Sequence, residues 1–396
     1  MFDDVVDDGV ARTRLRGLRP EASLLMALAR PRLTSAAQEN IRDFLAVSGA
    51  DLDWGLFLDQ ACRHGVLPLA GRNLMRYRLV HSPEGRTLAP YRWIYSYAYE
   101  GNRRRNIALG DEYAKVVRGL NTVDLAYAIR KGPVLTEGVY RDLGSRRMSD
   151  LDVLLHPKSF PEFARIVNDL GYEQGHLSRN AEHVVPFDRE TQLVWRVALA
   201  NSALPFLKSA QRDDVELFVI DPCFSLFQSR SGITADVGDF LARAVDTTAF
   251  GELARMLDPV DQVIDCCVQL HVEATTLMYI EMGKDLMVLK FLDLVELLRG
   301  LSGEACKTLS ARVRGYGLGK VAFYALYHAA LLYPDDVPSD LVAEFDSGDL
   351  EFLDTYGVLD DQRQRWERSF AERLFDARRG LSLAVPSTVP VSRAIV

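Results

Sequence analysis

The sequence predicts an α+β fold, in which a small mixed β-sheet lies between two helical regions of the chain. Apolar residues recur every three or four positions over residues 20–125 and again over 238–375, which is the period of amphipathic helices. Between these regions, short apolar runs alternate with turn residues, as they do in β-strands. With 396 residues, 48% of them hydrophobic, the chain can form two or three packed units and a sizeable core.

The N-terminal helices are predicted by amphipathic stretches separated by turn residues. Apolar residues three and four positions apart occur in LLMALA, in IRDFLA and in WGLFLDQACRHG. A further stretch covers residues 102–120, and its apolar side is formed by Leu109, Tyr113, Val116, Val117 and Leu120. We therefore expect several short helices and then a longer one that ends near residue 120.

The expected sheet begins with an apolar run over residues 125–129, which ends in the turn Lys131-Gly132-Pro133. Pro133 suits the first position of a following helix, because its missing N–H is not needed there. A second strand is expected over residues 150–155. Its successor is a helix over 159–170, which Ser159 caps and Gly171 stops.

The remaining elements are predicted from shorter signals. Strands are expected over residues 183–187 and 192–197, with residues 188–191 as the hairpin turn between them, and a third strand over 215–220. Helical periodicity then returns. The chain is therefore expected to divide into a helical region over 1–120, a sheet-containing core over 121–222, a helical region over 223–381 and a flexible tail over 382–396.

Composition restricts the location and partners of the protein. No segment approaches the roughly 20 uninterrupted apolar residues of a membrane helix, and the first residues lack the apolar run of a secretory signal. The five cysteines have no CxxC spacing, which favours reduced thiols over zinc or disulfides. We expect a cytoplasmic protein. Its formal charge of -8 disfavours a general electrostatic attraction to nucleic acid. Because a nucleotide substrate is also negatively charged, its binding site would need local cations.

Two carboxylates lie two positions apart on the strand expected over residues 150–155. Side chains at i and i+2 of a strand share a face, so Asp150 and Asp152 point the same way, while Leu151 and Val153 face a core. Like charges so placed repel unless a cation lies between them. A hard divalent ion such as Mg²⁺ satisfies this requirement. Two solvated acids at a strand edge are the plainer alternative.

The neighbourhood of these carboxylates favours a phosphate site. Lys131 can reach a phosphate as a point charge, and Gly132 allows close approach of the backbone. Arginine side chains, which bind phosphate oxygens, precede the carboxylates at Arg141, Arg146 and Arg147. The order of strand, glycine turn, helix, arginine loop and acidic strand collects phosphate and metal ligands at one sheet edge.

This pattern resembles the uncharacterised bacterial nucleotidyltransferases of the DNA polymerase β-like superfamily. The core of the resemblance is Lys131-Gly132, then Tyr140, then Arg146-Arg147-Met148-Ser149-Asp150-Leu151-Asp152-Val153-Leu154, with Leu-Gly-Tyr at 170–172. Softer similarity covers the upstream segments DW and ACRHGVLPL, and downstream LDPVD and KFLDL. In total it extends over roughly residues 20–300. Lys131-Gly132 stands where many members of the superfamily carry Gly-Ser.

The resemblance implies a small mixed sheet with helices on one face as the catalytic core, and metal-dependent nucleotidyl transfer. It implies that three carboxylates hold Mg²⁺ or Mn²⁺: Asp150, Asp152 and a third one on a later strand. Glu216 is the expected third carboxylate, and Asp214 is the alternative; if residues 192–197 form the equivalent strand, the third ligand is missing. The implied nucleotide-binding residues are Lys131, Gly132, Arg146, Arg147 and Ser149.

The expected function is transfer of a nucleoside monophosphate from a nucleoside triphosphate to an acceptor, with release of pyrophosphate. AMP is the group we expect to be transferred. The acceptor would be a hydroxyl or phosphate of a small molecule, peptide or protein, in preference to nucleic acid. A catalytically inactive protein that binds a nucleotide or a partner is the alternative, because the chain has Phe218 and Val219 where the family often has His and Trp. The sequence contains no P-loop, GxSxG or HExxH motif.

Overall fold

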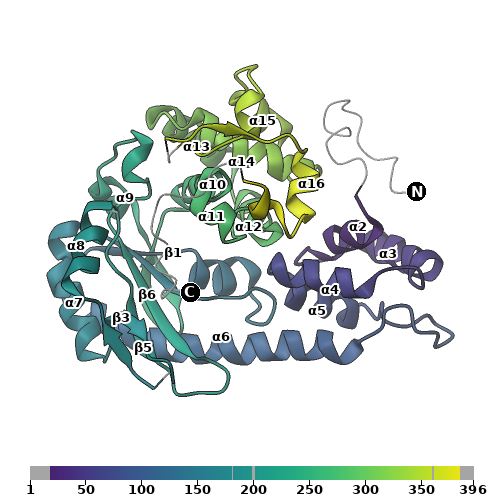
Figure 1. The fold of residues 1–396 in the computed structure, drawn as a ribbon, viewed down its shortest axis with the longest axis horizontal. Coiled ribbons are helices and arrows are strands. Elements are labelled where there is room, and N and C mark those ends of the chain that lie inside the picture. The colour runs from purple at the N-terminus through teal and green to yellow at the C-terminus, as the bar shows by residue number, and fades with distance from the viewer. Residues whose placement is uncertain (1–17, 181, 199–200, 359–360, 384–396) are drawn as a thin grey trace. The chain divides into compact units, whose positions relative to one another are not determined.

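The computed structural model describes residues 18–180, 182–198, 201–358 and 361–383 (Figure 1). The chain divides into two compact units. Of the described residues, the first unit draws on those within 18–100, 266–314 and 318–383, and the second on those within 101–265 and 315–317. Three helices, α6 (Arg92–Leu120), α10 (Pro259–Thr275) and the end of α13 (Gly303–Gly315), contribute residues to both units.

The first unit is largely helical. Its helices are α2 (Pro20–Leu28), α3 (Ser35–Ser48), α4 (Trp54–Arg63), α5 (Leu67–Arg76), α11 (Leu277–Glu281), α12 (Val288–Arg299), α13 (Gly303–Gly315), α14 (Gly319–Leu332), α15 (Ser339–Glu344) and α16 (Phe370–Phe375). Side-chain caps fix several of their starts: Thr34 Oγ1 accepts from Ala37 N at 3.2 Å, and Asp53 Oδ1 accepts from Leu56 N at 3.0 Å. A two-stranded sheet of β9 (Thr355–Tyr356) and β10 (Gln364–Arg365) completes the unit.

An eight-stranded mixed sheet forms the second unit. Its strands are β1 (Tyr127–Arg130), β2 (Leu151–Leu155), β3 (Glu173–Leu177), β4 (Val184–Pro186), β5 (Phe206–Ser209), β6 (Leu217–Cys223), β7 (Val245–Ala249) and β8 (Glu252–Met256). They lie in the order β4-β3-β5-β6-β2-β1-β8-β7. The central strand β2 is antiparallel to β1 and parallel to β6. The predicted α+β class is therefore confirmed.

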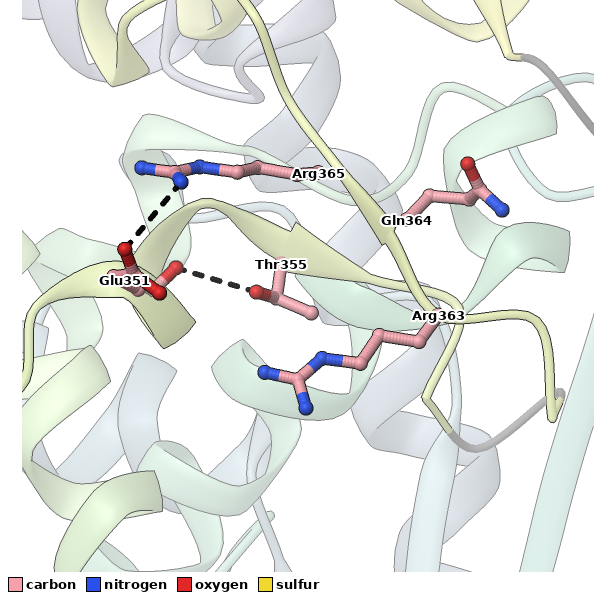
Figure 2. Close-up of a pocket in the computed structure, with 5 residues that line it drawn as sticks. All are labelled: Glu351, Thr355, Arg363, Gln364 and Arg365. Atoms are coloured by element: carbon pink, nitrogen blue, oxygen red, sulfur yellow. Dashed lines mark hydrogen bonds and ion pairs between the residues drawn. The ribbon is translucent and has the colours of Figure 1, made fainter.

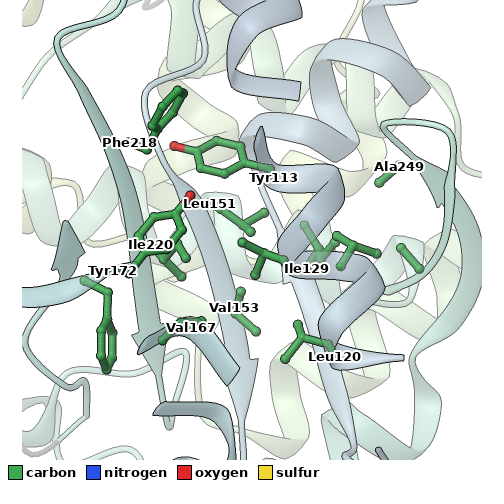
Figure 3. Close-up of a cluster of buried hydrophobic side chains, with 14 of the residues drawn as sticks. Tyr113, Leu120, Ile129, Leu151, Val153, Val167, Tyr172, Phe218, Ile220 and Ala249 are labelled. Atoms are coloured by element: carbon green, nitrogen blue, oxygen red, sulfur yellow. The ribbon is translucent and has the colours of Figure 1, made fainter. Parts of the chain in front are cut away.

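The central strands are apolar on one face and polar on the other. Ile129, Leu151, Val153, Phe218 and Ile220 pack with residues of α6 and of α7 (Phe160–Asp169) in one buried cluster (Figure 3). Because side chains alternate along a strand, the residues between them face the opposite side. That opposite face of the sheet carries the charged residues of the site.

Several predicted elements are confirmed, with shifts of one to three residues. They are the strands β1, β2, β4 and β6 and the helix α7. None of the helices in the described part of the chain is both long and apolar enough to cross a lipid bilayer.

The strand predicted over residues 192–197 is wrong, because the segment is the helix α8 (Arg189–Ala198). Its start explains the error: Asp188 Oδ1 accepts from Thr191 N at 2.7 Å, which is an N-terminal cap rather than a hairpin turn. The helical periodicity predicted over 238–375 does not hold near its start, since β7 and β8 form a hairpin there. Phe250 and Gly251 make its turn with φ of 56° and 78°, as a two-residue type I′ turn requires.

Glycines on α6 give a test of the packing between this helix and the sheet layer. A Cβ at Gly119 would lie 2.8 Å from Ile166 Cγ2 of α7, whereas a Cβ at Gly101 would meet no atom within 4 Å. Both substitutions to alanine gain the same helix propensity, about 1 kcal/mol. We therefore expect Gly119→Ala to be less stable than Gly101→Ala by about 1–3 kcal/mol, the cost of overpacking. Urea unfolding of the two variants measures the difference, and equal midpoints would contradict it.

Candidate active site

Three charged residues lie side by side on the polar face of the central strands. In the strand register, Asp152 of β2 is paired with Arg130 of β1 on one side and with Asp221 of β6 on the other. Neighbouring strands are about 4.8 Å apart, so the Asp152 and Asp221 side chains leave the sheet next to each other. Asp152 is 8% exposed and Arg130 7% exposed.

Asp150 adds a third carboxylate to this face. It lies two residues before Asp152, and Ser149 Oγ donates to its Oδ1 at 2.9 Å. Burial raises the pKa of Asp150, and the charge of Asp152 raises it further. Burial likewise raises the pKa of Asp221 well above its usual range, with Asp150 and Asp152 as the next causes. The three carboxylates therefore form a desolvated group with an excess of negative charge.

Lys131 supplies a cation to this group from the end of β1. Its Nζ lies 3.3 Å from Asp152 Oδ1, and its side chain is 25% exposed. Burial acts to lower the pKa of Lys131, but Asp152, followed by Asp265 and Asp150, raises it above its ordinary value. The Lys131 backbone has φ of 52°, in the left-handed region that residues with a Cβ rarely adopt.

Gly132 follows Lys131 at a point where the chain has little room. A Cβ at this position would lie 3.1 Å from Met148 Cγ and 3.3 Å from the backbone oxygen of Asp150. The glycine therefore allows the turn after β1 to pack against the start of β2. The helix expected to begin at Pro133 follows as a π-helix, Val134–Tyr140.

Arg130 is held on the polar face by a second acid. Its Nε donates to Asp265 Oδ2 of α10 at 2.9 Å, its Nη2 pairs with Asp265 Oδ1, and its Nη1 donates to Cys223 Sγ at 2.8 Å. The side chains of Arg130 and Asp265 are 8% and 5% exposed. This two-pronged ion pair fixes the Arg130 guanidinium beside Asp152.

The loop that carries the predicted arginines is anchored by α6. Asn106 Nδ2 donates to the carbonyl oxygens of Leu143 and Arg146 at 2.7 Å, and its Oδ1 accepts from Met148 N at 3.3 Å. Asn102 Nδ2 donates to Gly144 O at 2.8 Å. These helix residues lie on one side of α6, four positions apart.

Two further α6 residues on this side reach the start of β2. Arg105 Nη1 donates to Met148 O, and Tyr113 Oη bonds the backbone of Val219 on β6. The sequence prediction missed Asn102, Arg105 and Asn106, and it gave Tyr113 only as part of the apolar side of the helix. The sequence shows their spacing along the helix, but no sequence signal identifies the loop as their hydrogen-bonding partner.

The two predicted arginines differ in their surroundings. Arg146 is 8% exposed and lies close enough to Asp150 to lower the pKa of that carboxyl, although burial and Asp152 raise it more. Arg147 is exposed at the surface of the loop. Lys131, Gly132, Arg146, Ser149, Asp150 and Asp152 are therefore brought together, with Arg147 at the rim.

Glu216 and Asp214 are not part of this group. Glu216 is exposed and precedes β6, five residues before Asp221, which is roughly 16 Å along an extended strand. Asp214 is bound by Arg212 through two contacts of 2.7 and 2.9 Å, and Arg212 lowers its pKa. Asp221 is the carboxylate that lies beside Asp152. The sequence signal for it is an acid at the end of the apolar run, directly before Pro222.

The carboxylates have the chemistry of a divalent cation site. Oxygen ligands from Asp150, Asp152 and Asp221 are those that Mg²⁺ and Mn²⁺ prefer. After burial, the mutual repulsion of the carboxylates is the next cause of the raised pKa of Asp150 and of Asp221, and a bound cation would relieve it. Within the described residues, no three His, Cys, Asp or Glu side chains already converge as metal ligands do. The side chains would have to turn toward a common ion, and Lys131 now contacts one of them.

A surface pocket of the first unit has a different character. It encloses about 330 Å³ and is lined by Glu351, Thr355, Arg363, Gln364 and Arg365 (Figure 2). Arg365 Nη1 lies 3.7 Å from Glu351 Oε1. The pocket contains none of the predicted site residues, and we do not assign it a role in the chemistry below.

Comparison with known proteins identifies the family. A model of a family described as uncharacterised nucleotidyltransferase matches residues 50–334, which include the carboxylates of β2 and β6, Lys131 and the arginine loop. None of the curated proteins matches the chain. Because the match covers well over half of the sequence, the chain belongs to this family of nucleotidyltransferases.

Proposed function

We propose that the protein transfers a nucleoside monophosphate from a nucleoside triphosphate to an acceptor, at the polar face of β1, β2 and β6. The observation that carries the proposal is the register of β2 with β6, which puts Asp221 beside Asp152 and Asp150 on one face. Three carboxylates, of which Asp152 is buried and Asp150 and Asp221 are half-buried, repel one another and have little structural value by themselves. They are useful where a cation and a phosphate are to be bound.

The roles of the residues follow from their positions. Asp150, Asp152 and Asp221 would hold Mg²⁺ or Mn²⁺, and Lys131, Arg146 and Arg147 would bind phosphate oxygens, with Ser149 orienting Asp150. A divalent ion held there supplies positive charge to the triphosphate and lowers the pKa of an acceptor hydroxyl. The acceptor oxygen attacks the α-phosphorus and loses its proton, the bond to the β-phosphate breaks, and pyrophosphate leaves.

Asp221 also bears on the alternative of an inactive nucleotide-binding protein. That alternative was motivated by the missing family residues at Phe218 and Val219 and by doubt about a third carboxylate. Phe218 packs in the buried cluster on the apolar face, and Asp221 lies on the opposite, polar face. The presence of a third acid at the register position of Asp152 favours the catalytic protein.

The acceptor is proposed only by class. Charge -8 disfavours nucleic acid, so a small molecule, a peptide or a protein that offers a hydroxyl or phosphate is the expected acceptor, with AMP as the group transferred. The test is incubation of the protein with metabolite and peptide extracts, Mg²⁺ or Mn²⁺ and each NTP labelled at the α- or the γ-phosphate. Nucleotidyl transfer moves the α-label to the acceptor and the γ-label to pyrophosphate. Movement of the γ-label to an acceptor would instead show phosphoryl transfer.

Asp152→Asn is expected to abolish transfer while the protein stays folded. Asn has nearly the same shape as Asp but cannot offer a charged oxygen to a cation, and loss of such a ligand costs several kcal/mol of transition-state stabilisation. We expect at least about a hundredfold loss of kcat/KM. The measurement is label transfer, with circular dichroism as the control for folding. Transfer at the wild-type rate would rule out the assignment of this carboxylate.

The variants Asp221→Asn and Glu216→Gln distinguish between the two candidates for the third carboxylate. Because burial and its neighbours raise the pKa of Asp221, its ionised form opposes folding at neutral pH and the folded state binds more protons. In metal-free buffer, at a pH above the range in which Asp221 ionises, we therefore expect Asp221→Asn to raise Tm. The expected rise is about 2–4 °C for each kcal/mol of unfavourable burial and repulsion that the substitution removes. The same variant should lose transfer.

Glu216→Gln is the matched control, because Glu216 is exposed and lies outside the carboxylate group. Both its Tm and its transfer rate should remain at the wild-type values. The reverse pattern, with loss of transfer only in Glu216→Gln, would move the third carboxylate back to Glu216.

Asn106→Ala tests whether the anchored loop matters for nucleotide binding. The substitution removes three hydrogen bonds to the loop backbone and leaves buried groups unsatisfied, at a cost of about 1–3 kcal/mol. A loosened loop should raise KM for the NTP by about tenfold, with a smaller change in kcat. An unchanged KM would mean that the loop does not position the phosphate-binding arginines.

A further inference from the structure

Lys131 occupies the cation position of the carboxylate group through a single ionic contact. Its Nζ is 3.3 Å from Asp152 Oδ1, a long contact for an ion pair, and the lysine side chain is more exposed than the acid, 25% against 12%. A four-carbon side chain with one contact and access to solvent can change partners without rearranging the core.

Arg130, the other cation beside Asp152, does not have this freedom. It is bound to Asp265 by both sides of its guanidinium and also to Cys223, and it is buried. Moving it would leave Asp265 as an unpaired buried charge, which is strongly unfavourable. Of these two cations, Lys131 is therefore the one that can leave.

The backbone of Lys131 adopts a left-handed conformation. With φ of 52°, the residue lies in a region where glycine is comfortable and a residue with a Cβ costs about 1–2 kcal/mol. A glycine at position 131 would relieve the strain. From this conformation the Lys131 ammonium reaches Asp152.

A divalent ion bound at Asp152 would repel the Lys131 ammonium, which contacts the same carboxylate. An oxygen that binds a cation at about 2.1 Å brings that cation close to any ammonium on the same carboxylate, and the two positive charges then repel. A triphosphate offers the displaced ammonium a new anionic partner. The two ligands would then favour each other's binding.

We propose that Lys131 exchanges partners: it holds Asp152 in the empty site and moves to a phosphate oxygen of the NTP when the carboxylates bind a divalent ion. This inference rests on the proposed function, because it uses the same carboxylates. It adds that Lys131 couples the binding of metal to the binding of nucleotide. By linkage, the metal then strengthens nucleotide binding by the same factor by which nucleotide strengthens metal binding.

The exchange can be followed by competitive acylation of lysines in the full-length protein. An ammonium held by a carboxylate or phosphate reacts slowly, because its nitrogen is protonated and partly covered. Acylation of Lys131 is compared by mass spectrometry with that of Lys115, which is paired with Glu112 at 2.6 Å and serves as the internal reference. The three samples contain EDTA, Mn²⁺, or Mn²⁺ with an α,β-methylene NTP.

We expect the acylation of Lys131 to be low in EDTA, to rise about tenfold with Mn²⁺ and to fall again with the nucleotide analogue, while that of Lys115 stays constant. No rise with Mn²⁺, in protein that binds Mn²⁺ by electron paramagnetic resonance, overturns the exchange and leaves the proposed function intact. Absence of Mn²⁺ binding overturns the metal site itself, and the inference with it.

Two variants separate partner exchange from a general effect of charge. Lys131→Gln should bind Mn²⁺ about tenfold more tightly than the wild type in the absence of nucleotide, because the competing ammonium is gone. Arg104→Gln removes one positive charge from the exposed surface of α6 and should change Mn²⁺ affinity by no more than about twofold, since exposed charges are screened. Equal effects of the two variants, or no effect of Lys131→Gln, would overturn the exchange.

Discussion

Repulsion among Asp150, Asp152 and Asp221 is the constraint on which the rest of the second unit depends. The register of β2 with β6 puts these acids on one face, and burial removes the water that would screen them. Two cations lie beside these acids, and the protein holds them in different ways. Arg130 is fixed by Asp265, whereas Lys131 makes one long contact. Two consecutive residues at the end of β1 thus carry one firmly held and one loosely held positive charge.

The apolar face of the same strands makes this arrangement possible. Leu151 and Val153 alternate with the acids and are fully buried against α6 and α7 (Figure 3). A slip of one residue in the pairing of β2 would put carboxylates into that core, so the hydrophobic pattern fixes the register strongly. The stability of the apolar layer therefore maintains an unfavourable charge arrangement on the polar layer, as is common at functional sites.

The sequence was sufficient for those parts of the fold and site that depend on local pattern. The alternation around Asp150 and Asp152, the turn at Lys131-Gly132 and the helix after β2 follow from residue order alone. The third acid did not, because Asp221 joins the group through pairing between strands that are far apart in the chain. The family resemblance pointed to Glu216, which lies in the same apolar run but outside the sheet. The β7–β8 hairpin was missed for a related reason: its turn uses Phe250 in a left-handed conformation, which residue type does not predict.

The strand end at Lys131 joins local and long-range constraints. Chain direction there is set by the left-handed lysine and by Gly132, which packs close to Met148 and the backbone of Asp150. The same loop backbone is bound by Asn106 of α6, so the turn after β1, the arginine loop and the start of β2 are held as one assembly. Within it, the Lys131 side chain is less firmly held than the backbone that carries it. A rigid frame with one loosely held cation suits the proposed exchange, in which Lys131 would give up Asp152 to a metal ion and move to the nucleotide.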